Sequence, residues 1–266
     1  MKRPKPAPPV GVLLKEWRRM RGKSQLALAV EANLSPRYLS FVESGRARPS
    51  REFLHTVAHA LHIPLREQNL LLSAAGFAPA HPESTLAAED LGPLRAALTR
   101  LLTLQEPYPA VLLDRQWNVL ETNRSAPKLF SRFVDLSAMP EPRNLLRTMF
   151  GRMRPWVENW DEVAESLSQR VFREAVAGVP DPRTLDLLAE LSGSEAPRGV
   201  GAGSRLPFHP VVFRKDSLRL SFFSMVTTVG SPLDVTAQEL RIEAFFPADR
   251  VTEEFAAEHL APGPAA

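Results

Sequence analysis

Hydrophobic positions recur every three or four residues along the first part of the chain. Between residues 11 and 76 this helical period is repeated in five short segments with tight connections. The first, GVLLKEWRRMRG, carries an apolar stripe that includes Trp17 and stops at Gly22. The pattern predicts a domain of five short helices over residues 11–76, preceded by a basic, Pro-rich tail at residues 1–10.

Polar residues mark the ends of the second and third of these helices. Ser24 precedes QLALAVEA, while Ser35 and Pro36 open PRYLSFVE, which stops at Gly45. Asn33 stands where the chain must turn sharply, and Asn tolerates a left-handed conformation better than most residues. Two short helices joined by such a turn predict a helix-turn-helix.

The hydrophobic pattern changes after residue 76. FAPAHPESTLAAEDLG, at 77–92, is rich in Pro and acidic residues and predicts a linker. AVLLDRQWNVLETN then predicts two short strands around a turn, and HPVVFRK, SLRLSFFSMVTTV and ELRIEAFFPAD predict three more. Helical segments lie between the second and third of these five strands. We expect an α+β domain with an antiparallel sheet over residues 93–257 and a flexible tail at 258–266.

Three further segments of this second domain have a clear pattern. NWDEVAESLSQRVFREAVAG predicts a strong amphipathic helix, RTLDLLAELSG a shorter helix, and SEAPRGVGAGSR a flexible loop. In the longest strand, Leu218, Leu220, Phe222 and Val226 alternate with residues such as Arg219 and Ser221. This period predicts a strand with one buried face.

Charge is distributed unevenly along the chain. Residues 1–80 have 13 Lys and Arg against 5 Asp and Glu, a formal charge of +8, and the remainder carries −5. This asymmetry favours a polyanion-binding head on an acidic body, although basic termini that serve only solubility are common. The chain has no Cys, no signal-peptide pattern and no apolar run long enough for a membrane span, so we expect a cytoplasmic protein.

The helix that begins at Pro36 divides into two faces. At 100 degrees per residue, Leu39 and Val42 share the inward side. Four side chains share the outward side, namely Arg37, Ser40, Phe41 and Ser44. Arg can bind guanine edges, Ser can bond a base or a phosphate, and a phenyl ring can contact a thymine methyl. The outward face is therefore a candidate recognition surface.

The stretch GKSQLALAVEANLSPRYLSFVESGRARPS resembles the Xre/Cro-type helix-turn-helix of phage repressors and bacterial regulators. The resemblance implies that Gln25 contacts phosphate, that the outward residues face bases, and that Arg18 pairs with Glu43. It departs from the family at Asn33, where the turn usually has Gly. The implied DNA-binding residues are Gln25, Ser35, Arg37, Tyr38, Ser40, Phe41, Ser44, Arg46 and Arg48.

From residue 11 onward, nearly the whole chain resembles regulators whose C-terminal half is an MmyB-like, PAS-like ligand-binding domain. The similarity lies in GRARPSREFLHTVAHALHIPLREQNLLLSAAGFAPAH, AVLLDRQWNVLETN, Asn159-Trp160 and SPLDVTAQELRIEAFFPAD. It implies a small apolar or amphiphilic effector, such as a fatty-acid-like molecule. The candidate ligand-binding residues are Asn123, Arg147, Phe150, Trp156, Asn159, Trp160, Phe172, Phe213 and Phe222, although each aromatic also fits plain core packing.

Other patterns are better explained by structure than by chemistry. His55, His59 and His62 share a helical face but lack further metal ligands, and a solvated polar face explains them. The glycines of SEAPRGVGAGSR do not follow a strand as a phosphate loop would. Asp161 and Glu162 are stabilising at the N-terminal end of a helix, where the helix dipole is positive, and Glu165 follows on the same helix. We therefore expect no enzyme, no metal and no bound cofactor beyond an effector.

The sequence thus predicts a DNA-binding transcriptional regulator with a small-molecule effector. A homodimer on a palindromic operator is the usual arrangement for such proteins. The alternative is a regulator whose second domain only dimerises or binds another protein, with no effector. Operator sequence, effector identity and the sign of regulation are left open.

Overall fold

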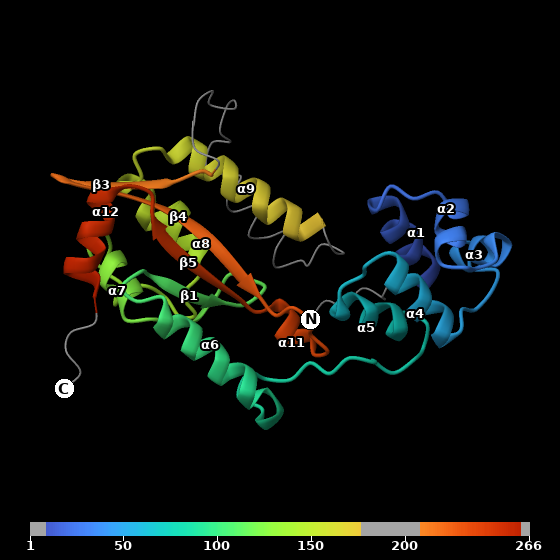
Figure 1. The fold of residues 1–266 in the computed structure, drawn as a ribbon. Coiled ribbons are helices and arrows are strands. Elements are labelled where there is room, and N and C mark those ends of the chain that lie inside the picture. The colour runs from blue at the N-terminus through green and yellow to red at the C-terminus, as the bar shows by residue number, and fades with distance from the viewer. Residues whose placement is uncertain (1–8, 177–207, 262–266) are drawn as a thin grey trace, which may run out of the picture. The chain divides into compact units, whose positions relative to one another are not determined.

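The computed structural model describes residues 9–176 and 208–261. The chain forms two compact units, one built mainly on residues up to Glu83 and the other beginning at Ser84 (Figure 1). The division falls inside the segment expected to be a linker. RTLDLLAELSG and SEAPRGVGAGSR, the predicted short helix and loop, lie outside the described residues.

The first unit, over described residues 9–83, has the five predicted α-helices. They are α1 Val10–Met20, α2 Gln25–Glu31, α3 Pro36–Glu43, α4 Arg51–Ala60 and α5 Leu65–Ala74. Trp17, Leu28, Leu39 and Val57 are almost completely buried in one shared core. Each of these helices is short, so burial of its apolar stripe contributes more stability than helix propensity alone.

The caps and the turn between α2 and α3 form as the sequence predicts. The Ser24 hydroxyl accepts from the Ala27 amide at 3.0 Å, and the Ser35 hydroxyl accepts from the Tyr38 amide at 3.4 Å. Asn33 has a φ of 51°, in the left-handed region. The turn therefore forms without the usual Gly, because Asn tolerates this backbone region better than most residues.

The first half of the predicted linker is packed on the helical unit. The Asn69 side chain of α5 accepts from the amides of Ala80 and His81, at 2.9 and 3.0 Å, and donates to the His81 carbonyl. Glu83 forms an ion pair with Arg66. An interval rich in Pro and acidic residues is here held by the Asn69 amide and the Arg66 ion pair, so it does not behave as a free linker.

The described part of the second unit contains a five-stranded antiparallel sheet. The strand order is β2-β1-β5-β4-β3, which confirms the expected α+β architecture. The strands are β1 Ala110–Leu113, β2 Val119–Thr122, β3 Val211–Lys215, β4 Leu218–Thr228 and β5 Arg241–Pro247. β5 lies at the centre although it is the last of these strands in the sequence. The β1–β2 hairpin pairs with one of its edges and the β3–β4 hairpin with the other.

Both faces of the central strands are covered. On one face α6 packs against Leu112 of β1 and Ile242 of β5, and the opposite face carries α9 (Figure 1). In the described part of this unit the α-helices are α6 Gly92–Leu104, α7 Ser125–Phe130, α8 Leu145–Thr148, α9 Trp160–Val176, α11 Val235–Glu239 and α12 Arg250–Phe255. Single-turn segments lie at Glu89–Leu91, Met149–Met153, Arg154–Trp156 and Ala256–Leu260. Residues at alternate strand positions therefore enter two separate cores.

The predicted burial of β4 holds for only half of the strand. Leu220 and Phe222 are buried as expected, but Val226 is 44% exposed and Met225 58% exposed. β3 pairs with β4 only as far as Phe222, so the rest of β4 has β5 as its one strand partner among the described residues. The alternation identifies which side chains share a face but does not determine whether another element covers that face.

Packed structure continues past residue 258, the predicted start of the C-terminal tail. Leu260, in the turn after α12, is completely buried in the sheet-and-helix core. The Ser125 hydroxyl donates to its carbonyl at 2.9 Å, and Lys128 donates to the carbonyl of Ala261. The expected boundary at residue 258 is therefore too early, because a single apolar residue before APGPAA gives little periodic signal. In the described parts, no helix is long and apolar enough to cross a membrane.

Candidate nucleic-acid interface and ligand cavity

The third helix presents the outward face that its sequence period predicts. Arg37 and Ser44 are exposed, Ser40 and Phe41 are half-buried, and Val42 lies in the core. The Arg37 guanidinium lies over the Phe41 ring at 5.4 Å from its centroid. A cation–π contact of this kind helps to hold the guanidinium in one orientation. DNA contact by these residues stays a prediction.

The acidic residue of this helix is turned inward. Glu43 accepts two hydrogen bonds from Arg18 of α1, at 2.6 and 2.8 Å, as the resemblance implies. The two side chains are only 3% and 10% exposed. The outward face of α3 therefore has no exposed carboxylate to repel a phosphate backbone.

The protonation equilibrium of this pair favours its charged form. Burial alone would raise the pKa of Glu43, but hydrogen bonds from Arg18 and Gln25, with the Arg18 charge, bring it below its ordinary value. The hydrogen bond to Glu43 raises the Arg18 pKa despite burial. The pair is a charged, bidentate connection between α1 and α3.

Gln25 occupies the start of α2 and is tied to the same pair. Its Nε2 donates to Glu43 Oε2 at 2.7 Å. An amide nitrogen has two hydrogens, so one can stay on Glu43 while the other bonds a phosphate oxygen. The phosphate contact implied for Gln25 is compatible with this geometry and stays a prediction.

The segment after α3 is folded back on the helix. The Phe41 carbonyl accepts from the Arg46 amide at 2.8 Å, and the Tyr38 hydroxyl donates to the Arg48 carbonyl at 3.0 Å. The Tyr38 ring packs edge-on against Phe53, so this side chain also anchors α3 to α4. Arg46 and Arg48 remain exposed on the fixed segment, where cations can reach a phosphate backbone.

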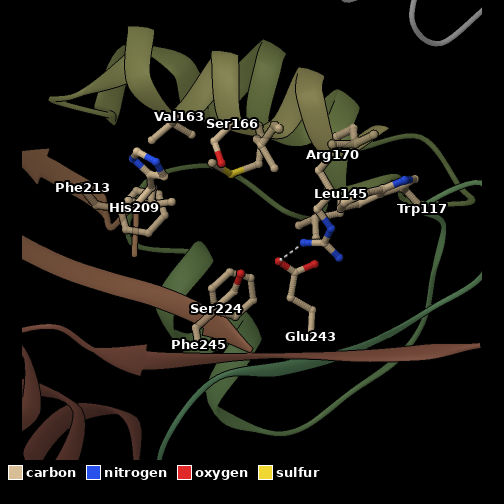
Figure 2. Close-up of a pocket in the computed structure, with 14 residues that line it drawn as sticks. Trp117, Leu145, Val163, Ser166, Arg170, His209, Phe213, Ser224, Glu243 and Phe245 are labelled. Atoms are coloured by element: carbon tan, nitrogen blue, oxygen red, sulfur yellow. Dashed lines mark hydrogen bonds and ion pairs between the residues drawn. The ribbon is translucent and has the colours of Figure 1, made fainter. Parts of the chain in front are cut away.

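A cavity lies in the second unit between α9 and the sheet (Figure 2). Its volume is about 90 Å³. Apolar side chains make most of the wall, including Trp117, Leu145, Val163, Phe213 and Phe245. Polar groups also line it, and they are Ser166, Arg170, His209, Ser224 and Glu243.

One end of this cavity holds a charged pair on an aromatic ring. Arg170 of α9 donates to Glu243 of β5 at 3.0 Å, and its guanidinium lies 4.5 Å from the Trp117 ring centroid (Figure 2). Arg241 lies 4.1 Å from the same centroid. Trp117 is 1% exposed, so the pair lies against a buried ring.

Sequence reasoning missed this charged end of the cavity. Glu243 stands between Ile242 and Ala244 in a strand that is buried on both faces, where a carboxylate is rare unless it is paired. That position was a usable signal for a functional or structural ion pair. Its partner Arg170 lies 73 residues earlier, and no spacing pattern connects the two.

The nine predicted ligand-binding residues are distributed through the unit rather than gathered at the cavity. Among them, Phe213 lines the described cavity wall, and Phe222 is packed beside it at 6.5 Å between ring centroids. Phe150 and Trp160 pack edge to face, while Trp156 lies under the Lys215 ammonium. Ligand contact by these residues stays a prediction.

The other members of that set are engaged with the backbone or exposed. Asn123 accepts from the Ala110 and Ala126 amides, both at 3.1 Å, and donates to two backbone carbonyls. Asn159 similarly bonds the backbone of Pro210 and Val212. Both amides fasten separate chain segments together. Arg147 and Phe172 are exposed and do not line the cavity.

The residues considered for metal or acid chemistry lie on or next to α4 and α9. Among the described residues, no group of three His, Asp or Glu residues is placed to hold a metal ion. His55 and His59 each contact another His ring, at 6.4 and 6.5 Å between centroids. Asp161 and Glu162 occupy the first turn of α9, as expected for the helix dipole. Gly199, Gly201 and Gly203 lie outside the described residues.

Comparison with known proteins matches both units to families. Residues 94–258 match the MmyB-like transcription regulator ligand binding domain, and residues 14–68 match the Helix-turn-helix family. No curated protein matches the chain significantly. Among solved structures, the structure of an RNA-binding Light-Oxygen-Voltage receptor is 13% identical with a TM-score of 0.28. The match covers 94% of this chain but only 61% of that chain, and its low score supports no functional argument.

Proposed function

The chain belongs to the family of MmyB-like transcription regulators and carries a helix-turn-helix with a ligand-binding domain, and we propose that it binds one specific operator as a homodimer. The observation that carries the proposal is the outward face of α3. It combines an ordered Arg37 with Ser40 and Phe41, while the acid of the same helix is withdrawn into the core.

In the proposed complex α3 lies in the DNA major groove. Arg37, Ser40, Phe41 and Ser44 contact base edges. Gln25, Ser35, Tyr38, Arg46 and Arg48 contact or support contacts to the phosphate backbone, which fixes the position of the helix. A symmetric dimer would bind two half-sites about 34–36 Å apart, one DNA turn.

The ligand-binding domain would take an apolar or amphiphilic effector in the cavity between α9 and the sheet. Binding pockets for drug-sized molecules usually have volumes of about 300–1,000 Å³. The cavity here is about 90 Å³, so a larger effector requires α9 to move away from the sheet. An effector that binds one position of α9 better than another would shift the regulator between two states.

The DNA-binding proposal is tested by selecting operators from random DNA and then comparing variants. Arg37→Ala should relax base preference at one position, since a bidentate contact discriminates by about 1–3 kcal/mol. Gln25→Ala should weaken binding evenly across sequences. Arg19→Ala is the matched control, because it removes the same charge from an exposed position of α1. Unchanged binding by both Arg37→Ala and Gln25→Ala would show that the outward face of α3 does not contact DNA.

A second candidate function is favoured by the small volume of the cavity. In it the second unit binds no effector and serves only dimerisation or protein binding. Denaturing extraction of the purified chain followed by mass spectrometry separates the two. Recovery of one small molecule in stoichiometric amount supports the effector, and its reproducible absence supports the interaction module. Catalysis is not proposed, since the family is one of regulators.

A further inference from the structure

Glu243 carries an unsatisfied carboxylate oxygen at the wall of the cavity. Its side chain is 4% exposed, and Oε1 accepts from Arg170. Its Oε2 is buried and has no hydrogen-bond partner among the described residues. A buried acceptor without a donor is destabilising, and the effect is larger for a charged group. A bound molecule that donates a hydrogen bond to Glu243 Oε2 would therefore be stabilised there.

The surroundings of this oxygen restrict which ligands could donate a hydrogen bond to it. In Figure 2 the Glu243 carboxylate points from β5 towards α9, between Arg170 and the apolar side of the cavity. Trp117 and Phe245 line the same space, with small hydroxyls from Ser166 and Ser224. A ligand in contact with Oε2 must therefore have an apolar body beside its polar end.

We propose that the cavity binds a small apolar molecule that ends in a hydroxyl or ammonium group, and that this group donates to Glu243 Oε2. The assignment rests on the proposed effector-binding function and specifies the polar end of the effector. A carboxylate in the same place would bring two negative oxygens together with no proton between them. The preferred head is therefore different from that of a fatty acid.

The size of the cavity restricts the enclosed part of the ligand. A single water takes about 10–15 Å³ of such free volume, so 90 Å³ corresponds to about six to nine waters. A single aromatic ring with a one-carbon head fits this space. A long chain fits only if α9 moves.

Three probes of one size and different heads test the proposal on the full chain. Benzylamine, benzyl alcohol and benzoate share a phenyl ring, and their affinities are measured by titration calorimetry. The amine and the alcohol should bind at least about tenfold more tightly than benzoate, as expected for one hydrogen bond to a charged acceptor. Equal or tighter binding of benzoate would overturn the assignment of a donor head.

Glu243→Gln tests the named atom. It removes the negative charge and keeps the size, so benzylamine should bind about tenfold more weakly. Benzoate, now beside the Arg170 guanidinium without the Glu243 charge, should gain affinity. Glu158→Gln is the matched control, because Glu158 pairs with Arg214 and Arg219 outside the cavity wall. A probe preference that Glu243→Gln leaves unchanged would overturn the role of Oε2.

A second variant keeps the test meaningful if Glu243→Gln fails to fold by circular dichroism. Ser166→Leu fills the cavity from α9 and should abolish binding of both the amine and the alcohol. Undiminished binding in this variant would place the site elsewhere. If none of the probes binds the parent chain, the cavity holds only water and the inference fails, while the Arg37→Ala result still decides DNA binding independently.

Discussion

The Arg18–Glu43 pair offers the sharpest test of how α3 is held against α1. Glu43→Ala removes the acceptor of two charge-assisted hydrogen bonds and leaves the buried Arg18 guanidinium with the Lys23 carbonyl as its remaining acceptor within the described chain. Breaking a buried pair by removing one partner costs about 3–5 kcal/mol. Total stabilities of domains are about 5–15 kcal/mol, so a large fraction of this unit's stability should be lost.

Hydrogen exchange is the suitable measurement because the chain has two units. Peptides from α1 and α3 report the opening free energy of the helical unit separately from the sheet domain. Glu31→Ala is the matched control, since Glu31 pairs with Lys23 on the surface of the same unit and its side chain is 47% exposed. That control should cost less than about 1 kcal/mol. A loss for Glu43→Ala no larger than for the control would refute the buried-pair reasoning.

The same pair predicts a pH dependence with a definite sign. The folded-state pKa of Glu43 lies below its ordinary value, so the unfolded chain binds the proton more readily. The stabilisation is therefore complete above the unfolded-state pKa and is lost as pH falls through the lower folded-state pKa. Opening free energies of α1 and α3 should fall more steeply with acid in the parent chain than in Glu43→Gln. If the opening free energies of the parent chain and of Glu43→Gln fell equally with decreasing pH, this linkage would be contradicted.

Substitutions at three further positions test the packing of α1 on α3, the turn at Asn33 and the C-terminal end of the chain. Gly11→Ala should destabilise the helical unit by about 1–3 kcal/mol, because a Cβ would collide with the Val42 carbonyl and lie 2.9 Å from the Glu43 carbonyl oxygen. An unchanged opening free energy in hydrogen exchange would exclude so close an approach of α1 and α3. Asn33→Ala should cost about 1–2 kcal/mol and Asn33→Gly almost nothing, since φ is 51°; equal losses in denaturant titration would rule out the left-handed turn. Leu260→Ala should lower the stability of the sheet unit by about 2–5 kcal/mol, because Leu260 is completely buried. An unchanged melting temperature would show that Leu260 does not pack in the core.

Most features of the helical unit can be predicted from the sequence, because they depend on local patterns. Helix period, Ser caps and the positive φ of Asn33 depend on residues within one turn of each other, and these features appear as expected. The outward face of α3 follows from the same period, because Leu39 must be buried and the opposite side must then be exposed. Helical periodicity is therefore sufficient to identify the outward face of α3.

The sheet domain shows where local rules stop. The strands and their positions along the chain follow from period and turns, but β5 enters the centre of the sheet by pairing with strands from both ends of the domain. Val226 satisfies the alternation and is still exposed, because coverage depends on a neighbour that the period does not specify. Leu260 is buried for the opposite reason, since α7 lies beside an isolated apolar residue.

What the sequence alone determined is the class of the protein, its two units and the side of α3 that faces outward. What the tertiary structure decided is the cavity between α9 and the sheet and its polar end. Aromatic residues near strands predicted a pocket, yet most of them pack elsewhere and Phe213 alone of that set lines the described wall. Arg170 and Glu243 are separated by 73 residues, and only the packing of α9 on β5 brings a charge pair and an unsatisfied oxygen to one place.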